Sequence, residues 1–162
     1  MARSSMLPAD SRGFILSRLP HRPPFLWVDE VVMLEEDRLV ATTTISADLD
    51  LFRGHYPHYP LMPGVLLCEA VFQAGALLIA ERLRAEGEGD VSPAGVPVLT
   101  RILGARFKRE VRPGDVIRIE VRLKEQVGPA WFLAGKVLVH ERTAVTVDFA
   151  CTLKVGETEA GP

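Results

Sequence analysis

Two histidines, three prolines and two glycines lie close together in residues 51–64, which read LFRGHYPHYPLMPG. Proline at this density restricts the backbone and indicates a rigid loop. His55 lies in this loop, and histidine is the side chain that exchanges a proton most readily near neutral pH. The loop therefore predicts a general base that is held in place ahead of the next element.

That next element is a helix, because a long segment without turn signals follows Pro63. The N–H groups of Gly64 and Val65 would begin the helix, where they have no partner within it and the helix dipole favours negative charge. An oxygen that gains charge in a reaction would bind there. Glu69 lies five residues after Gly64 on an otherwise apolar helix, and burial favours the protonated form of a carboxyl. Glu69 is therefore a candidate proton donor.

Each of these residues also has a purely structural interpretation. A lone loop histidine such as His55 is commonly a hydrogen-bonded structural residue, whereas a buried carboxyl such as Glu69 is tolerated mainly where a partner or a function requires it. Gln73, one turn after Glu69, either caps buried backbone groups or contacts substrate. His58 and Tyr59 are expected to pack within the loop.

The helix that must position these groups is predicted over residues 63–84, PGVLLCEAVFQAGALLIAERLR. Residues 65–80 are apolar around the whole circumference except at Glu69 and Gln73, so we expect other structure to surround the helix. This stretch is shorter than the ~20 residues that a bilayer requires, and it carries a carboxylate. A membrane span is therefore not predicted.

Strands are predicted on both sides of the helix. Apolar and polar residues alternate with period two in residues 116–124 and 146–154, which is typical of strands with one buried face. Weaker strand patterns, with turns at 112–115 and 127–129, cover residues 26–34, 39–46, 98–109 and 131–140. One buried helix and about six strands with one apolar face predict an α+β protein, in which an antiparallel sheet wraps around the central helix. This is the hotdog fold.

The length of 162 residues fits a single domain, which we place at residues 12–155 between tails at 1–11 and 156–162. The chain has 19 lysines and arginines against 21 aspartates and glutamates, a formal charge of 19 − 21 = −2. This balance argues against nucleic acid as a partner.

Cys68 and Cys151 lie in apolar segments without metal-ligand spacing, so they are predicted to be free buried thiols, and no metal site is expected. The N-terminal residues have no continuous apolar stretch that could act as a secretory signal. We therefore expect a cytoplasmic protein.

Three segments of the sequence, in the same order along the chain, resemble the beta-hydroxyacyl-(acyl carrier protein) dehydratases of fatty acid synthesis, FabZ type. They read LPHRPPFLWVDEV at 19–31, FRGHYPHYPLMPGVLLCEAVFQ at 52–73 and ARFKREVRPGDVI at 105–117. The resemblance implies that His55 and Glu69 are catalytic and that the Gly64 N–H polarises the thioester carbonyl. A related group of dehydratase/isomerases has aspartate at the helix position, so Glu69 favours the plain dehydratase.

The resemblance also implies a homodimer with shared active sites, which in this family often assembles as a trimer of dimers. The substrate would be an acyl chain on the phosphopantetheine of acyl carrier protein, with no further cofactor. Arg106, Lys108 and Arg109 are candidates for binding that acidic carrier, although Arg106 and Lys108 also fit the exposed face of a strand with Phe107 turned inward. His21 and Arg22 are expected to be structural.

Two departures from the family pattern affect the expected substrate and the last strands. His58 and Tyr59 make the loop bulkier beside His55, so the acyl chain or the pathway can differ from ordinary fatty acid synthesis. The segment VLVHERTAVTVDFACTL, residues 137–153, lacks the glycine-containing turn of the family. Two other functions stay open: a hotdog acyl thioesterase, and a non-catalytic subunit that binds acyl carrier protein and pairs with an active dehydratase.

Overall fold

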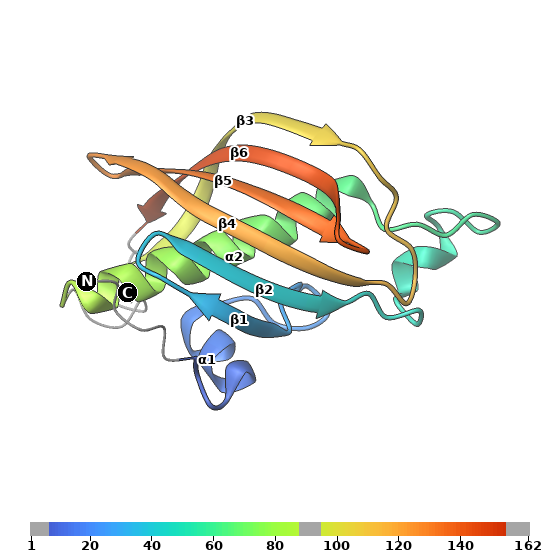
Figure 1. Ribbon diagram of the computed structural model, residues 1–162, viewed down its shortest axis with the longest axis horizontal. Helices are drawn as coiled ribbons and strands as arrows, with labels where there is room; N and C mark the ends of the chain where they lie inside the picture. The colour runs from blue at the N-terminus through green and yellow to red at the C-terminus, as the bar shows by residue number, and fades with distance from the viewer. Residues whose placement is uncertain (1–6, 88–94, 155–162) are drawn as a thin grey trace, which may run out of the picture.

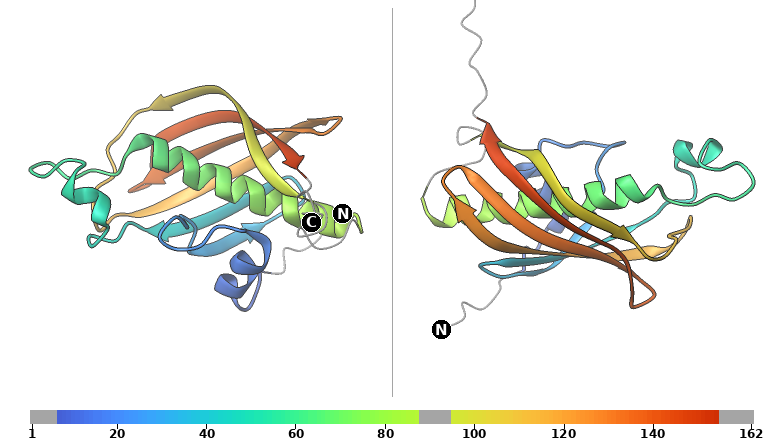
Figure 2. Two further views of the ribbon diagram at one scale, coloured as in Figure 1. Left: turned by 180° about the vertical axis from the view of Figure 1, so that it is seen from behind. Right: turned by 90° about the horizontal axis from the view of Figure 1, so that it is seen from above.

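An antiparallel sheet of six strands wraps around one long helix, α2 (Gly64–Ala85), in the computed structural model (Figures 1 and 2). The structure describes residues 7–87 and 95–154. The strands, in the sheet order β1-β2-β4-β5-β6-β3, are β1 (Glu30–Leu34), β2 (Arg38–Thr44), β4 (Val116–Val127), β5 (Ala130–Val139), β6 (Arg142–Lys154) and β3 (Val96–Phe107). This arrangement confirms the predicted hotdog fold.

Helix α2 begins one residue later than predicted and ends one residue later. Pro63 is its N-cap, which suits a residue without an N–H group, and Arg82 and Arg84 in the last turn complement the helix dipole. By length and composition α2 is, among the described residues, the one helix that is able to cross a membrane. Its most apolar window is 67% buried inside the protein, so α2 is the core helix of this fold.

The predicted alternation places the core between the sheet and α2. Ile117, Ile119 and Val121 of β4 are buried, whereas Arg122 and Lys124 on the other face are exposed. The apolar face of the sheet meets the helix closely. For this reason Gly135 of β5 has no room for a side chain, because a Cβ there would collide with Val71 of α2.

The hairpin between β5 and β6 forms although its turn contains no glycine. His140 and Glu141 adopt φ angles of 48° and 60°, the left-handed conformation that a two-residue type I′ hairpin turn requires. Nε2 of His140 also lies 3.1 Å from Asp115 Oδ1 in the turn before β4. The two-residue turn therefore sets the register of the last two strands without the glycine that the family pattern led us to expect.

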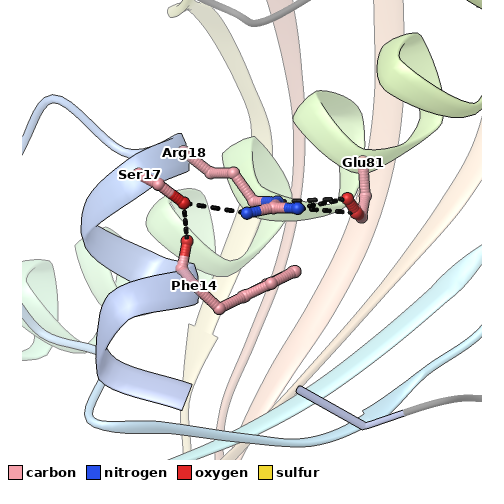
Figure 3. A network of polar contacts seen from close by, with 4 residues as sticks. All are labelled: Phe14, Ser17, Arg18 and Glu81. Atoms are coloured by element: carbon pink, nitrogen blue, oxygen red, sulfur yellow. Dashed lines mark hydrogen bonds and ion pairs between the residues drawn. The ribbon is translucent and has the colours of Figure 1, made fainter. Parts of the chain in front are cut away.

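A short helix that the sequence analysis does not predict, α1 (Ser11–Arg18), packs beside β1 and α2. Asp10 caps it by accepting a hydrogen bond from the Gly13 N–H at 2.9 Å. Figure 3 shows how α1 is joined to α2: the Arg18 guanidinium donates to Glu81 Oε1 at 2.9 and 3.1 Å and lies over the Phe14 ring. Helix α1 thus closes the core near the C-terminal half of α2, at the far end from Gly64.

Strand β3 is the edge of the sheet and is exposed along most of its length. It pairs with β6 on one side only. Six large apolar residues on it are exposed and form what we call the β3 apolar face: Val96, Val98, Leu99, Ile102, Leu103 and Phe107. An edge strand with this much exposed apolar surface is a site for pairing with another chain.

Candidate active site

The tautomer of His55 is set by a backbone carbonyl. Its Nδ1 lies 2.8 Å from the carbonyl oxygen of Leu61, and a carbonyl can only accept a hydrogen bond. Nδ1 therefore carries the proton, and Nε2 of the neutral ring is left with a lone pair. A histidine oriented in this way is ready to act as a base through Nε2.

The start of α2 presents free backbone donors next to this loop. Pro63 caps the helix without a side-chain hydrogen bond, and no described residue accepts a hydrogen bond from the N–H of Gly64 or Val65. Val65 is 70% exposed. Two free N–H groups at the positive end of a helix dipole can stabilise an oxygen that gains negative charge.

Gly64 lies in close contact with the last residue of β3. A Cβ at this position would lie 2.6 Å from two carbons of the Phe107 ring. Of the two alternatives for this segment, the one in which Phe107 turns inward is wrong, because the ring rests against Gly64 and is 57% exposed. Phe107 thus forms an apolar wall beside the free N–H groups of the helix.

Glu69 lies in the second turn of α2, and its side chain is 22% exposed. The carboxyl is not enclosed by apolar groups alone, because Oε1 accepts a hydrogen bond from Gln73 Nε2 at 3.0 Å and lies 3.5 Å from His21 Nε2. Oε2 has no hydrogen-bond partner among the described residues. The arrangement holds one oxygen and leaves the other available for proton transfer.

Gln73 is buried, with 1% of its surface exposed, and its amide is fully engaged. Oε1 accepts from the Trp27 N–H at 2.8 Å, and Nε2 donates to the Phe25 carbonyl at 3.0 Å as well as to Glu69. Of the two interpretations that the sequence left open, these contacts match the cap for buried backbone groups. Gln73 connects Glu69 to the segment that crosses the helix between α1 and β1.

The two cysteines are free and buried, as predicted. Burial raises the pKa of Cys151 to about 11, with a further contribution from the nearby Glu69 carboxylate. Burial also raises the pKa of Cys68. Both thiols therefore stay protonated at neutral pH and are poor nucleophiles.

The loop that carries His55 projects beyond the end of the sheet, past the N-terminus of α2 (Figures 1 and 2). No hydrogen bond or ion pair joins His55 to Glu69 within the chain. The structure bonds His55 to Leu61, which lies three residues before the start of α2. It places Glu69 one and a half turns further along the same helix.

The structure adds a polar cluster that the sequence analysis misses. The Tyr59 hydroxyl donates to Glu110 Oε2 at 2.7 Å and accepts from Arg112 Nη2 at 2.8 Å. Arg112 also bonds Glu110 at 3.1 Å. Tyr59 was expected only to pack within the loop, and no spacing rule connects it with residues more than fifty positions away. The signal in the sequence is the departure at His58 and Tyr59 from the small or basic residue that the family pattern has after the GHYP element.

The three basic residues predicted to bind a carrier protein lie at the end of β3 and just after it. Arg106, Lys108 and Arg109 are all exposed. Lys108 and Arg109 border a groove of about 610 Å³, which is also lined by Glu110, Arg112, Asp115, Val139, His140 and Arg142. The groove is therefore lined by four arginine or lysine side chains and by two carboxylates.

A hotdog sheet around one helix, with a histidine loop, free N–H groups and a helix carboxyl, defines a protein of the hotdog-fold thioester dehydratase class. The FabA-like domain matches residues 19–148, so the chain belongs to the FabA-like family. Among the described residues, no group of three or more His, Cys, Asp or Glu side chains could hold a metal ion.

Relatives of known name match most of the chain. The 3-hydroxyacyl-[acyl-carrier-protein] dehydratase FabZ of Anaeromyxobacter dehalogenans (strain 2CP-C) is 41% identical over 136 residues, which cover 83% of this chain and 85% of the relative. The protein of the same name from Nitrosospira multiformis is 38% identical over 146 residues, covering 89% of this chain and 97% of the relative. The expected FabZ-type resemblance is confirmed.

Solved structures share the fold at lower identity. The dehydratase heterocomplex ApeI:P from Xenorhabdus doucetiae superposes with a TM-score of 0.72 at 20% identity, covering 90% of this chain and 93% of that chain. A hypothetical thioesterase from Streptococcus pneumoniae TIGR4 gives 0.58 at 14% identity, covering 78% and 85%. At these identities the two structures establish the hotdog fold.

Proposed function

We propose that this chain is a beta-hydroxyacyl-(acyl carrier protein) dehydratase, a hydro-lyase that converts a beta-hydroxyacyl thioester to the trans-2-enoyl thioester. The observation that carries this proposal is the hydrogen bond from His55 Nδ1 to the Leu61 carbonyl, which leaves Nε2 free as a base in the loop that leads into the free N–H groups of α2. The identity to named dehydratases over more than four-fifths of the chain supports it.

In this mechanism His55 Nε2 takes the proton from the carbon next to the thioester carbonyl. The Gly64 N–H stabilises the charge that develops on the carbonyl oxygen. Glu69 gives its proton from Oε2 to the beta-hydroxyl, which leaves as water while the C=C bond forms. His55 then loses its proton to water and Glu69 takes one up from water, so the enzyme is restored and atoms balance. We assign no cofactor beyond the phosphopantetheine arm that carries the substrate, and we place the enzyme in the cytoplasm.

Two copies of the chain would complete each site. The support comes from the β3 apolar face, which offers an unpaired strand edge to a second copy, and from the lack of a hydrogen bond or ion pair between the described residues His55 and Glu69 in one chain. We infer a homodimer in which each site combines His55 of one protomer with Glu69 of the other. Sedimentation analysis would distinguish this dimer from a trimer of dimers.

The assay is spectrophotometric, with crotonyl and longer trans-2-enoyl thioesters. Loss of enoyl absorbance without release of free thiol is the expected result, and both His55→Ala and Glu69→Gln should abolish it. Release of thiol in place of hydration would identify a thioesterase. Inactivity of the folded wild-type dimer at every chain length would identify a non-catalytic binding subunit.

Mixing the two inactive variants tests the shared site. If each site combines residues of two protomers, equal amounts of His55→Ala and Glu69→Gln re-formed together should recover about a quarter of the wild-type activity, because half of the dimers are mixed and one of their two sites is intact. No recovery after verified exchange of protomers would mean that both residues come from one chain.

The carrier protein is proposed to bind at Arg106, Lys108 and Arg109, beside the basic groove. Acidic surfaces bind basic ones with strong dependence on charge and salt. Lys108→Glu should therefore raise KM for a substrate on acyl carrier protein while KM for the same acyl group on a short pantetheine stays unchanged. Equal KM changes for both substrates would remove this surface from the proposal.

A further inference from the structure

The loop that carries His55 is bonded to itself closely enough to move as a unit. The Leu61 N–H donates to the His55 carbonyl at 3.2 Å, and His55 Nδ1 donates to the Leu61 carbonyl. At the tip the Tyr59 N–H donates to the Tyr56 carbonyl at 3.1 Å, and the Tyr56 ring stacks on the His55 ring with 4.2 Å between centroids. A displacement of the tip therefore changes the direction of the His55 ring.

Backbone hydrogen bonds tie this unit to the body of the protein at its base. At its base the Met62 N–H donates to the Val111 carbonyl at 2.7 Å, and the His55 N–H donates to the Leu51 carbonyl at 2.9 Å. The tip extends past the sheet (Figure 2). The side chain of Tyr59 joins the tip to the connection between β3 and β4.

The hydrogen bonds and ion pair among Tyr59, Glu110 and Arg112 form what we call the Tyr59 clamp. The hydroxyl of Tyr59 acts at once as donor to Glu110 and as acceptor from Arg112, and the Arg112 guanidinium lies 5.0 Å above the Tyr59 ring. Hydrogen bonds to charged groups are shorter and stronger than neutral ones. The exposed ion pair itself adds little to global stability.

The phenol stays in its protonated, donating form around neutral pH. The hydrogen bond to Glu110 raises the pKa of Tyr59, and Arg112 opposes this change in part. The same hydrogen bond, followed by that from Arg112, lowers the pKa of Glu110. The donor and the acceptor are therefore both in the required state at the pH at which His55 works as a base.

We propose that Tyr59, Glu110 and Arg112 are positioning residues, which hold the tip of the loop so that His55 Nε2 stays aimed at the substrate. This inference rests on the proposed dehydratase function. Small misplacements of a catalytic group slow the chemical step while ground-state binding is retained. The clamp therefore acts on kcat more than on KM.

The test removes the hydroxyl alone. Tyr59→Phe keeps the ring over which Arg112 lies and should lower kcat about tenfold, with KM within about twofold and with an unchanged melting temperature. A beta-hydroxyacyl thioester deuterated at the carbon next to the carbonyl should show a larger primary isotope effect on the kcat of dehydration in the variant. The reason is that proton transfer from this carbon to His55 becomes more rate-limiting. Loss of structure elsewhere would not produce this isotope effect.

A second variant and a matched control complete the experiment. Glu110→Ala should reduce kcat by a similar factor, and the double variant should be no slower than either single one, because both changes break the same clamp. Arg122→Gln removes an exposed ion pair of similar length, 3.0 Å to Asp37, on the far part of the sheet and should leave kcat unchanged.

Two outcomes overturn the inference while the wild type remains an active dehydratase. One is a wild-type kcat and isotope effect in Tyr59→Phe, and the other is an equal loss in the Arg122→Gln control. An inactive wild-type protein would instead overturn the proposed function itself, so the two failures are distinguishable.

Discussion

The acid and the base of the candidate site are held in opposite ways. Glu69 lies on the core helix, and its Oε1 is bonded by Gln73, which is itself buried against backbone groups of the preceding segment. His55 lies on a loop that projects from the body of the protein and is held by backbone turns and by the exposed Tyr59 clamp.

Because of this difference, we expect substitutions near Glu69 and substitutions near His55 to affect stability and activity differently. A change around Glu69 disturbs buried hydrogen bonds and therefore affects both folding and catalysis. A change in the loop around His55 disturbs exposed contacts, which contribute little to the free energy of unfolding. We expect the loop to tolerate variation that alters rate without altering the fold.

The largest expected effect comes from removing the two reacting groups. His55→Ala and Glu69→Gln should each lower kcat by about 10²-fold to 10⁴-fold, the range of a lost general base or acid. Steady-state kinetics of enoyl hydration measures both losses. If one variant keeps more than about a tenth of the activity, that residue is not the proposed acid or base.

Gln73→Leu tests whether the hydrogen bonds of Gln73, which also hold Glu69, contribute to the stability of the core. The Trp27 N–H and the Phe25 carbonyl would lose their partner, and each unsatisfied buried group costs about 1–3 kcal/mol. Urea denaturation should show a fall of about 2–4 kcal/mol in the free energy of unfolding. Tyr59→Phe is the matched change on the loop and should not shift the same curve; equal shifts would remove the contrast between the regions.

Gly64→Ala is expected to have a smaller effect on activity. Gly64 lies between the loop that carries His55 and the part of α2 that carries Glu69. The added Cβ collides with the Phe107 ring, which is exposed and can move outward. We expect an increase of about 1 kcal/mol in the activation free energy, because the N–H that binds the oxyanion is displaced. Gly64→Ala with Phe107→Ala should recover activity, and persistent loss in the double variant would show that the collision is not the cause.

The smallest effect is a titration shift at Glu110. Its folded-state pKa is lowered by hydrogen bonds from Tyr59 and Arg112, so the clamp is complete above the ordinary glutamate pKa and is lost as the pH falls through the lowered value. A ¹³C NMR titration of the Glu110 carboxyl should find this lowered midpoint. Tyr59→Phe should move the midpoint back toward the ordinary value, and an unmoved midpoint would mean that Tyr59 does not bond Glu110 in solution.

The fold was predictable because its pattern is local. Period-two alternation in residues 116–124 and an apolar stretch at 65–80 define a sheet around a helix, and both are confirmed. Helix α1 was missed, because its short sequence SRGFILSR has weak amphipathic character and is stabilised by Asp10 and by the bond from Arg18 to Glu81. Contacts between residues 63 positions apart leave no periodic signal.

The sequence by itself determined the residue types of the candidate site and their order: a histidine loop, a glycine at the helix start and a carboxyl on the helix. Tertiary structure alone decided that Gln73 turns its amide to the backbone near Trp27, that Phe107 lies against Gly64, and that Tyr59 reaches Glu110 and Arg112. The physical reason is that spacing along a chain fixes which residues share an element, whereas the partners of a side chain depend on which elements the fold brings together.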